Sequence, residues 1–259
     1  MDQIIVITGA SSGIGAAVAE RVGRAGASPV LVARRAPELA RVAERSGPNA
    51  LTVVADVTRR AEVENVVAAA LARFGRIDVF INNAGRGMSR PVAELTDEDF
   101  DEMMLVNVKS ALYGMQSVLP HFKERRRGHL INVSSMLGRI PFASARAAYS
   151  AAKHALMSLT ANLRVDLQAE FPDIHVSSVI PGVVATDFGL NARHGGIDSR
   201  QFPFAQPVSE VAEVIANLIE HPRAEVYTRP IYQQQVANYF SAEDVATIES
   251  QPPFVIPKR

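Results

Sequence analysis

Tyr149 and Lys153 stand four residues apart in a segment whose apolar spacing predicts a helix. Side chains at that spacing share one helical face. A free tyrosine has a pKa of about 10, which is too high for a good base near neutral pH. An ammonium beside the phenol favours the phenolate and lowers this pKa. Alone, such a pair is an ordinary feature of a helix surface, but within a site it could exchange a proton with a substrate oxygen.

Two further polar residues could serve the same chemistry. Ser135 follows a predicted strand, where its hydroxyl could donate to an oxygen that gains negative charge; Ser134 is the adjacent alternative. Asn107 lies inside a predicted helix, where asparagine is unfavourable because its side chain competes for backbone hydrogen bonds. Each residue is ordinary alone, whereas their joint occurrence with Tyr149 and Lys153 indicates a catalytic site.

A glycine-rich turn follows the first predicted strand. Gly9, Gly13 and Gly15 let the backbone turn tightly, and the helix that follows offers free N–H groups to a phosphate. The spacing G-x-x-x-G-x-G differs from the G-x-G-x-x-G of many dinucleotide sites. Such turns also join strands to helices where no ligand binds, so the second strand has to support the assignment.

Arg34 and Arg35 follow the second predicted strand, where an acidic residue would hold the ribose 2′-hydroxyl of NAD. Guanidinium groups suit a 2′-phosphate, both by charge and by the geometry of their N–H groups. Without the glycine turn, two arginines here would be an ordinary solvated start of a helix. With it, NADP is the expected cofactor and NAD is less favoured.

The elements that must position these residues alternate along the chain. Short, mostly β-branched runs predict strands buried on both faces, at residues 4–7, 30–32, 51–54, 79–81, 130–133, 176–180 and 225–227. Helical spacing separates them, at residues 14–24, 38–45, 60–74, 97–124, 147–170 and 209–220. This alternation predicts a doubly wound parallel α/β sheet of about seven strands with helices on both faces.

Composition limits the partners. The chain has 259 residues and a formal net charge of zero, which gives no electrostatic reason to expect nucleic acid or a membrane as partner. No cysteine is present, and no histidine spacing predicts a metal site. The N-terminus has no signal-peptide pattern and no stretch suits a membrane span, so a cytoplasmic location is expected.

Residues 1–259 are expected to form a single domain with one unusual segment. Residues 187–207 are rich in Gly, Asn, Ser, Arg and Pro and have little periodicity. Long segments of this kind in compact domains are often lids, so a substrate lid is expected here.

In their order along the chain, these features resemble the short-chain dehydrogenase/reductase family over about residues 4–186. The resemblance is carried by Thr8-Gly9-x-x-x-Gly13-Ile14-Gly15, Asp56-Val57, Asn82-Asn83-Ala84-Gly85, the set Asn107, Ser135, Tyr149 and Lys153, and Pro181-Gly182-x-x-x-Thr186. Ser135 lies 14 residues before Tyr149, against nearer 13 in the family, but Ser135-Met136-Leu137-Gly138 reproduces the family's Ser-x-x-Gly. Ser12 stands where an arginine often accompanies NADP use.

The resemblance implies a Rossmann-like oxidoreductase that moves a hydride between NADP(H) and a small alcohol or carbonyl substrate. It implies that Tyr149 is the general acid and base, that Lys153 lowers its pKa and binds ribose, that Ser135 polarises the substrate oxygen, and that Asn107 joins the proton relay. The implied cofactor site comprises Gly9, Ser11, Ser12, Gly13, Ile14, Gly15, Arg34, Arg35, Asp56, Val57, Asn83, Ala84, Gly85, Tyr149, Lys153, Pro181, Gly182, Val184 and Thr186.

Alternatives of other classes remain at this point. One is a non-catalytic dinucleotide-binding regulator, because a fold does not fix a function; another is a lyase, dehydratase or epimerase that uses the same tyrosine. The substrate is not readable, since the residues that could line an apolar pocket could equally belong to the core: Met88, Met136, Leu137, Phe142, Phe188, Phe202 and Phe204.

The two longest predicted helices, 97–124 and 147–170, carry apolar residues on more than one side. A helix that only covered a sheet would need a single apolar stripe. A homo-oligomer is therefore expected, as a tetramer with two-fold axes, with a dimer as the alternative. The resemblance implies that these two helices form the interface.

Overall fold

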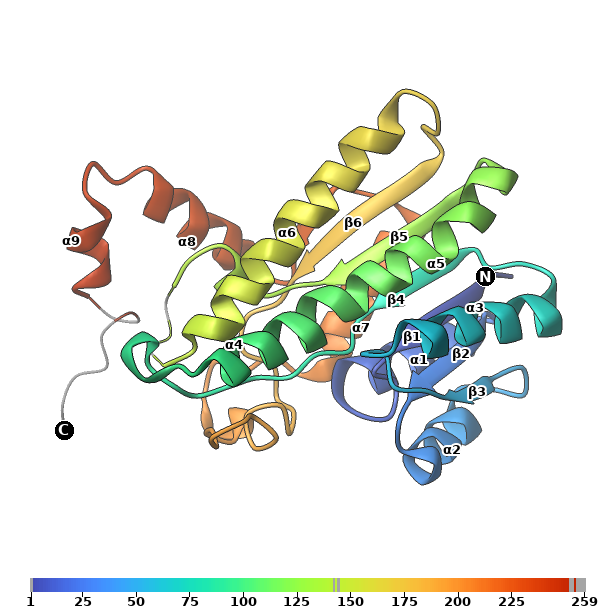
Figure 1. Ribbon diagram of the computed structural model, residues 1–259, viewed down its shortest axis with the longest axis horizontal. Coiled ribbons are helices and arrows are strands. Elements are labelled where there is room, and N and C mark those ends of the chain that lie inside the picture. Colours follow the sequence, from blue (N-terminus) through green and yellow to red (C-terminus); the bar gives the residue numbers. More distant parts are fainter. Residues whose placement is uncertain (1, 142, 144, 252–253, 255–259) are drawn as a thin grey trace.

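A computed structural model describes residues 2–141, 143, 145–251 and 254. Seven strands form one sheet in the order β3-β2-β1-β4-β5-β6-β7, and all neighbours pair in parallel (Figure 1). The strands are β1 Ile4–Thr8, β2 Ser28–Ala33, β3 Leu51–Val54, β4 Val79–Asn82, β5 Gly128–Val133, β6 Ile174–Ile180 and β7 Glu225–Tyr227. The predicted doubly wound α/β sheet is confirmed.

Helices cover both faces of the sheet. They are α1 Gly13–Arg24, α2 Ala36–Arg45, α3 Arg60–Phe74, α4 Asp97–Met104, α5 Ser110–Arg125, α6 Ala147–Gln168, α7 Val208–Glu220, α8 Pro230–Phe240 and α9 Val245–Glu249. Residues of α1, α2 and α7 form one apolar core with the sheet, and residues of α3, α5 and α6 form the other. None of the helices in the described part of the chain is long and apolar enough to cross a membrane.

The strands read as continuous apolar runs because successive residues enter different cores. In β1, Ile5 and Ile7 join the α1 and α7 side, whereas Ile4 and Val6 join the α3 and α5 side. The expectation of burial on both faces is wrong for β3, the edge strand. Its burial alternates: Leu51 and Val53 are partly buried against the second core and the residues between and after them are exposed.

The segment predicted as one helix over 97–124 is interrupted. A π-helical turn, Leu105–Lys109, separates α4 from α5, and Asn107 lies at its centre. Such turns are rare and occur frequently at functional sites. Helices α8 and α9, which the sequence pattern does not predict, extend from one end of the sheet (Figure 1). Val236 and Tyr239 of α8 pack with Met136 and Met157 beside the end of β5.

Residues 187–207, orange in Figure 1, form a loop whose two ends meet. The Ala185 N–H donates to the Gln206 carbonyl at 2.8 Å, and the Gln206 N–H donates to the Val183 carbonyl at 2.8 Å. The loop contains only turns, bends, two isolated bridge residues and one short 3₁₀ turn, Ser199–Gln201. It therefore stands on the carboxyl edge of the sheet as a compact loop closed at its base.

Candidate active site

The glycine loop packs tightly between β1 and α1. Gly9 and Gly13 have φ values of +68° and +57°, in the left-handed region that favours glycine. A Cβ at Gly15 would lie 2.4 Å from the Gly9 carbonyl oxygen. Side chains at these positions would therefore force the loop away from the start of α1, where free N–H groups can meet a phosphate.

The end of β4 is fastened to this loop. Thr8 Oγ1 accepts hydrogen bonds from the Asn83 and Ala84 N–H groups at 3.0 and 3.1 Å. Asn83 Nδ2 donates to the Thr8 carbonyl at 2.9 Å. Asn83, Ala84 and Gly85 are thus held beside the glycine turn, and Thr8, named in the sequence only as part of the glycine motif, is a positioning residue.

Arg35, which follows β2, lies against the same loop. Arg35 Nη2 donates to Ser11 Oγ at 3.0 Å and to Ser12 Oγ at 3.1 Å. Although burial opposes the effect, hydrogen bonds from Thr58 and the charges of Arg34 and Arg59 lower the pKa of Asp56. The structure thus brings one of the predicted 2′-phosphate residues, Arg35, together with the loop serines, and the other, Arg34, near Asp56. Val57, which follows Asp56, packs against the second core.

The turn after β6 also lies against the glycine loop. A Cβ at Gly13 would lie 3.3 Å from Thr186 Cγ2. The Pro181 carbonyl accepts from the Met136 N–H at 2.9 Å, which joins this turn to the end of β5. A hollow of about 340 Å³ lies here, lined by loop residues, the Thr186 turn and Arg200. Gly182 faces the ring of Tyr232 on α8, and Val184 forms a bridge with Gln206.

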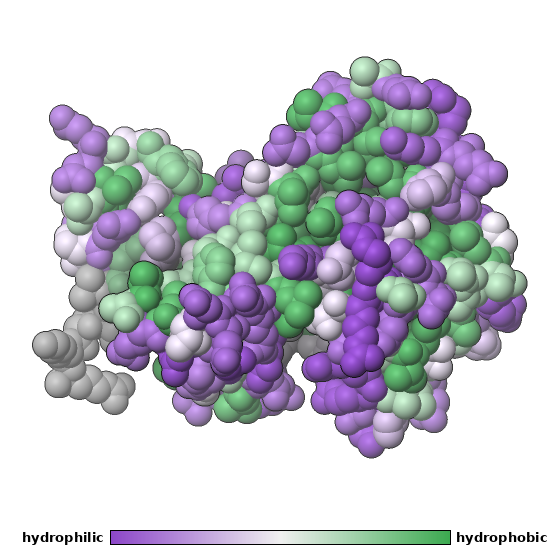
Figure 2. All heavy atoms as spheres, in the orientation of Figure 1, coloured by the Kyte–Doolittle hydropathy of each residue, from purple (hydrophilic) through white to green (hydrophobic). Residues whose placement is uncertain are grey.

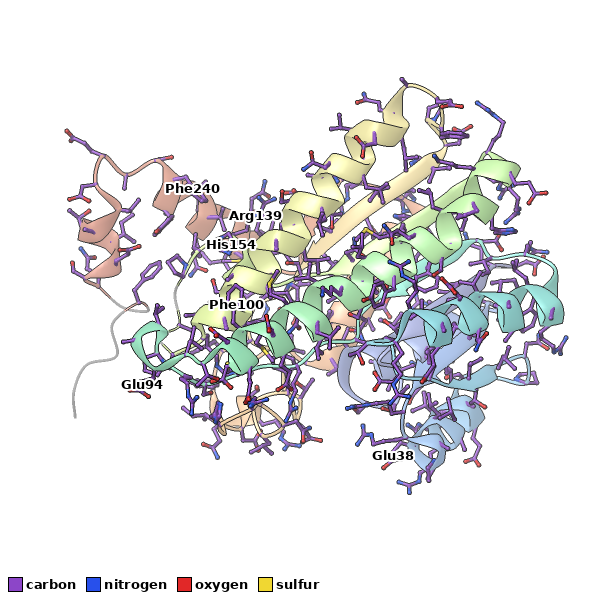
Figure 3. The ribbon with its side chains drawn as sticks, in the orientation of Figure 1. Glu38, Glu94, Phe100, Arg139, His154 and Phe240 are labelled. Carbon is purple, nitrogen blue, oxygen red and sulfur yellow. The ribbon has the colours of Figure 1, made fainter. Side chains whose placement is uncertain are left out.

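Buried polar contacts fix α6, the helix that carries the proton-transfer pair. Asn82 Nδ2 on β4 donates to Asn132 Oδ1 on β5 at 2.8 Å, and Asn132 Nδ2 donates to Thr160 Oγ1 on α6 at 2.8 Å. Arg139 and His154, labelled in Figure 3, lie near the place where the segment after β5 meets α6. The pair therefore stands on a helix tied to two central strands.

Tyr149 and Lys153 are both buried, with 7% and 3% of their surface exposed. The Lys153 ammonium lies 5.6 Å from the centre of the Tyr149 ring and donates to the Val133 carbonyl at 2.9 Å. Burial lowers the pKa of Lys153 to about 8. The predicted pair is brought together, but the ammonium is also bonded to the backbone of β5.

The expected lowering of the Tyr149 pKa by Lys153 is wrong for this structure. Burial raises the pKa of Tyr149 to about 12, and the hydrogen bond with Ser135 and the charge of Arg146 only partly oppose this. The physical reason is that removing a phenolate from water is unfavourable, and this outweighs the nearby donors. Tyr149 is therefore a protonated phenol throughout the neutral range.

Ser135, rather than Ser134, meets the phenol. The Ser135 side chain is hydrogen-bonded to Tyr149 and its Oγ accepts from the Leu137 N–H at 3.2 Å. Ser134 Oγ instead contacts the Lys153 carbonyl at 3.4 Å. The hydroxyl of Ser135 therefore has the position needed to act on the same oxygen as Tyr149.

Asn107 is held in the π-helical turn by three contacts. Its Oδ1 accepts from the Arg86 N–H at 3.2 Å, and its Nδ2 donates to the carbonyls of Arg86 and Met103 at 3.0 and 3.2 Å. A Cβ at Gly85 would lie 2.8 Å from Asn107 Oδ1 and 3.7 Å from Lys153 Nζ. A side chain at position 85 would therefore collide with the Asn107 amide and lie against the lysine.

The apolar candidates divide between core and surface. Met88 and Leu137 share a buried cluster with Tyr149, whereas Met136 packs with α8. Phe188 stacks edge-on against the Tyr149 ring, with centroids 5.5 Å apart. Phe202 is half-buried beside the exposed Phe204. Phe142 lies outside the described residues.

The sequence reasoning also missed Arg146, whose charge acts on the Tyr149 phenol. Its signal was present, because a residue three positions before Tyr149 lies on the same face of the helix.

Comparison with known proteins agrees with this geometry. The family model described as short chain dehydrogenase matches residues 3–195. The chain belongs to the short-chain dehydrogenase family. An uncharacterized oxidoreductase of Staphylococcus epidermidis is 36% identical over 194 residues, covering 73% of this chain and 83% of the relative.

Two solved structures of the family show similar folds with nucleotides bound. An alcohol dehydrogenase from the archaeon Thermococcus sibiricus, complexed with 5-hydroxy-NADP, has a TM-score of 0.78 and 28% identity, covering 90% of this chain and 98% of that one. A short-chain dehydrogenase/reductase from Burkholderia phymatum, in complex with NAD, has a TM-score of 0.85 and 25% identity, covering 100% and 98%. One of these structures thus contains a nucleotide of the NADP type and the other contains NAD.

Proposed function

We propose that this short-chain dehydrogenase transfers a hydride between NADP(H) and an alcohol or carbonyl substrate, with Tyr149 as the acid and base. The observation that carries the proposal is the convergence of Ser135, Tyr149 and Lys153 at the carboxyl edge of the sheet. The Ser135 side chain bonds the phenol, and the buried ammonium lies 5.6 Å from the ring. A non-catalytic regulator has no need of this arrangement.

The residues at this edge fit a nicotinamide dinucleotide. The glycine loop has no room for side chains at Gly9 and Gly15, so its backbone is open to close approach. We assign the diphosphate to this loop, the adenine to Asp56 and Val57, and the nicotinamide end to residues 83–85 and the Thr186 turn. Lys153 retains N–H groups beyond the one given to Val133, and ribose hydroxyls suit them. The nicotinamide supplies or accepts the hydride.

NADP is favoured over NAD by the charge beside the loop. Arg35 contacts Ser11 and Ser12, and its nearest carboxylate, Glu38, is 4.0 Å away. A 2′-phosphate placed there would gain charge-assisted hydrogen bonds that a 2′-hydroxyl cannot form.

The chain's own residues account for the proton chemistry. In reduction, the Tyr149 phenol gives its proton to the oxygen of the forming alcohol. Ser135 donates to the same oxygen and stabilises its developing charge. Lys153 stays mostly protonated below its pKa of about 8, so a positive charge lies 5.6 Å from the Tyr149 ring during the transfer. Asn107, across Gly85 from the lysine, is assigned to the relay that returns the proton.

Residues 187–207 are proposed to be the substrate lid of a single catalytic domain. Phe188 of this loop packs edge-on against the buried Tyr149 ring, which supports a movement of the loop when a substrate reaches the phenol. Hydrogen exchange in the loop should slow when cofactor and substrate bind. Full protection in the free protein would instead indicate a rigid connector.

A homo-oligomer, as a tetramer or a dimer, is proposed from the helices α5 and α6. Leu112 and Leu119 on α5 and Leu159 and Leu163 on α6 are only partly buried, and Val165 is exposed. Figure 2 shows hydrophobic residues on the face that these helices form. Light scattering would test this; a mass near the 28.0 kDa of one chain would exclude it.

The proposed function is tested by following nicotinamide absorbance with a panel of aldehydes, ketones and alcohols. We expect steady NADPH oxidation with at least one carbonyl compound, and slower oxidation of NADH. Binding of nucleotide without turnover across the panel would support a regulator. Conversion of a substrate without change in the nucleotide would support a lyase or epimerase.

A further inference from the structure

A half-buried guanidinium lies beside the phenol that we assign to proton transfer. Arg146 is the residue that caps the start of α6, three positions before Tyr149. Burial lowers the pKa of Arg146, and the electrostatic interaction with Tyr149 only partly opposes this. Because an arginine remains protonated in proteins, a partly desolvated positive charge stands at this place.

Two glycines leave room for this side chain. Arg146 Nη1 donates to the Met88 carbonyl at 3.2 Å. A Cβ at Gly87 would lie 2.9 Å from Nη1, and a Cβ at Gly196 would lie 3.0 Å from Nη2. The guanidinium is therefore enclosed between the loop after β4 and the lid, on the side from which a substrate must approach Tyr149.

The neighbouring arginines are all neutralised. Arg86 and Arg193 pair with Glu102, and Arg90 and Arg193 pair with Asp99. Arg146, in contrast, forms no ion pair with any carboxylate in the described part of the chain.

This difference points to a missing anion. Asp99 is completely buried and also accepts from His194, so it has little capacity left for a further cation. Removing a charge from water without a partner is unfavourable. The unpaired guanidinium of Arg146 is therefore explained if a ligand supplies the anion that pairs with it.

We propose that Arg146 is a specificity residue that pairs with a carboxylate of the substrate, so that the enzyme acts on keto acids or hydroxy acids. The inference rests on the proposed function, because Tyr149 must act on the carbonyl of the same molecule. The planar fork of a guanidinium matches a carboxylate with two parallel hydrogen bonds. Phe188 must leave the Tyr149 ring as the substrate enters.

The first test compares acids with matched neutral compounds. Pyruvate, acetoacetate and levulinate are each reduced alongside their methyl esters, with NADPH as donor. We expect wild type to favour at least one acid over its ester by roughly tenfold or more in kcat/KM. Dihydroxyacetone phosphate against dihydroxyacetone shows whether a phosphate serves better than a carboxylate. Equal use of every acid and its ester would overturn the inference.

Variants then attribute that preference to Arg146. Arg146→Gln should lower kcat/KM for the preferred acid by roughly 10- to 100-fold, chiefly through KM, and should change that of the ester little. Arg146→Lys should retain part of the preference. Arg24→Gln, which removes the same charge from the exposed end of α1, is the matched control and should leave the acid-to-ester ratio unchanged.

A competing role gives a different result. If Arg146 only adjusted the Tyr149 pKa, Arg146→Gln would slow acid and ester equally through kcat and would shift the pH profile for both. That outcome would overturn the specificity role. Should the Gln variant fail to fold, the Lys variant and the wild-type comparison carry the test.

A binding measurement separates this inference from the proposed function. Butyrate cannot be reduced, so its binding to the NADP⁺-saturated protein, measured by calorimetry against butyramide, needs no turnover. We expect butyrate to bind wild type at least tenfold more tightly than butyramide, and this preference to vanish in Arg146→Gln. No preference for butyrate would overturn the inference even in an active enzyme. Turnover of neutral ketones alone would leave the proposed function intact.

Discussion

The two edges of the sheet both bury ionisable side chains, but Asp78 at the amino edge forms ion pairs and the described residues Tyr149 and Lys153 at the carboxyl edge do not. At the amino edge, the Asp78 carboxylate accepts from the Ile4 N–H at 2.9 Å and from Arg76 and Arg125 at 3.0 Å each. At the carboxyl edge, Tyr149 and Lys153 are buried with no ion pair among the described residues. The buried charge of Asp78 at the amino edge is therefore paired with charges of opposite sign, whereas, in the described part of the chain, that of Lys153 at the carboxyl edge is not.

The pKa directions follow the same division. At the amino edge, the N–H of Ile4 and the two arginines lower the pKa of Asp78 even though burial opposes them, so the charged form is stabilised. At the carboxyl edge, burial prevails: the pKa of Tyr149 is raised to about 12 and that of Lys153 is lowered to about 8. Ionisable groups whose pKa values are strongly shifted are characteristic of catalytic sites.

Volume alone does not distinguish the edges. A hollow of about 360 Å³ lies at the amino edge near Asp78 and His129, against about 340 Å³ beside the glycine loop. His129 Nε2 lies 2.8 Å from Ser177 Oγ, which itself donates to the Arg223 carbonyl, so the imidazole is held as a donor at Nε2. The pairing of charges, rather than the size of a hollow, indicates where ligands bind.

The largest effect should come from Tyr149→Phe at the carboxyl edge. We expect kcat to fall by about 10²–10⁴-fold, the contribution of a general acid, with Tm and nucleotide affinity nearly unchanged. Turnover with a working substrate, together with thermal unfolding, measures both. Tyr113→Phe on α5 is the matched control and should keep full activity. A Tyr149→Phe enzyme that retains most of its activity would remove Tyr149 from the mechanism.

At the amino edge the effect should fall on stability instead. Asp78→Asn keeps the shape of the side chain but removes the charge that two arginines share. Because both arginines are partly exposed, we expect a loss of about 2–3 kcal/mol in the free energy of unfolding. Urea denaturation measures it. A variant with normal stability but a large loss of kcat would contradict the separation of the two edges.

Cofactor choice should depend on Arg34 and Arg35. Replacing both, as Arg34→Asp with Arg35→Ala, should weaken NADP binding by roughly 10- to 100-fold and leave NAD binding much less affected. Fluorescence titrations with each nucleotide decide this, with Arg41→Ala on α2 as a control for charge. Wild type that binds NAD as tightly as NADP would refute the assignment.

The smallest effect is that of pH on reduction. Lys153 is active as the cation and loses its proton as pH rises through about 8, while Tyr149, with a pKa of about 12, remains a proton donor. The value of kcat/KM should therefore be level below pH 8, fall about twofold near pH 8 and approach a tenfold loss per unit above it. A profile that stays flat or rises between pH 7 and 9 would exclude this role for Lys153.

The sequence predicted the central strands well because burial on both faces leaves a continuous apolar run, whereas the edge strand β3 is buried on one face alone. It also predicted that Tyr149, Lys153 and Ser135 come together. Tyr149 and Lys153 share one face of α6, and Ser135 directly follows the strand β5, so local structure alone determines these positions. It did not predict α8, whose apolar residues Val236 and Tyr239 share a cluster with Met136 and Met157, which lie far away in the chain.

The electrostatics of the site were less predictable. The spacing of Tyr149 and Lys153 gives their common face, but not how deeply both are buried. The bond from the Lys153 ammonium to Val133 depends on where β5 ends in space. The pairing of Arg193 with Asp99 joins residues 94 positions apart, and it helps to occupy the carboxylate that lies closest in the fold to the segment of Arg146. Pairing of charges across the fold is set by tertiary packing, which no local pattern encodes.

The most direct test of hydride transfer uses NADPH that carries deuterium at the transferable position of its nicotinamide. With a ketone that the enzyme reduces, the proposed chemistry predicts one deuterium on the carbon that was the carbonyl carbon, and one NADP⁺ formed for each alcohol. Magnetic resonance of the product reads both. Product without deuterium at that carbon, or product formed without oxidation of the nucleotide, would contradict hydride transfer by this site.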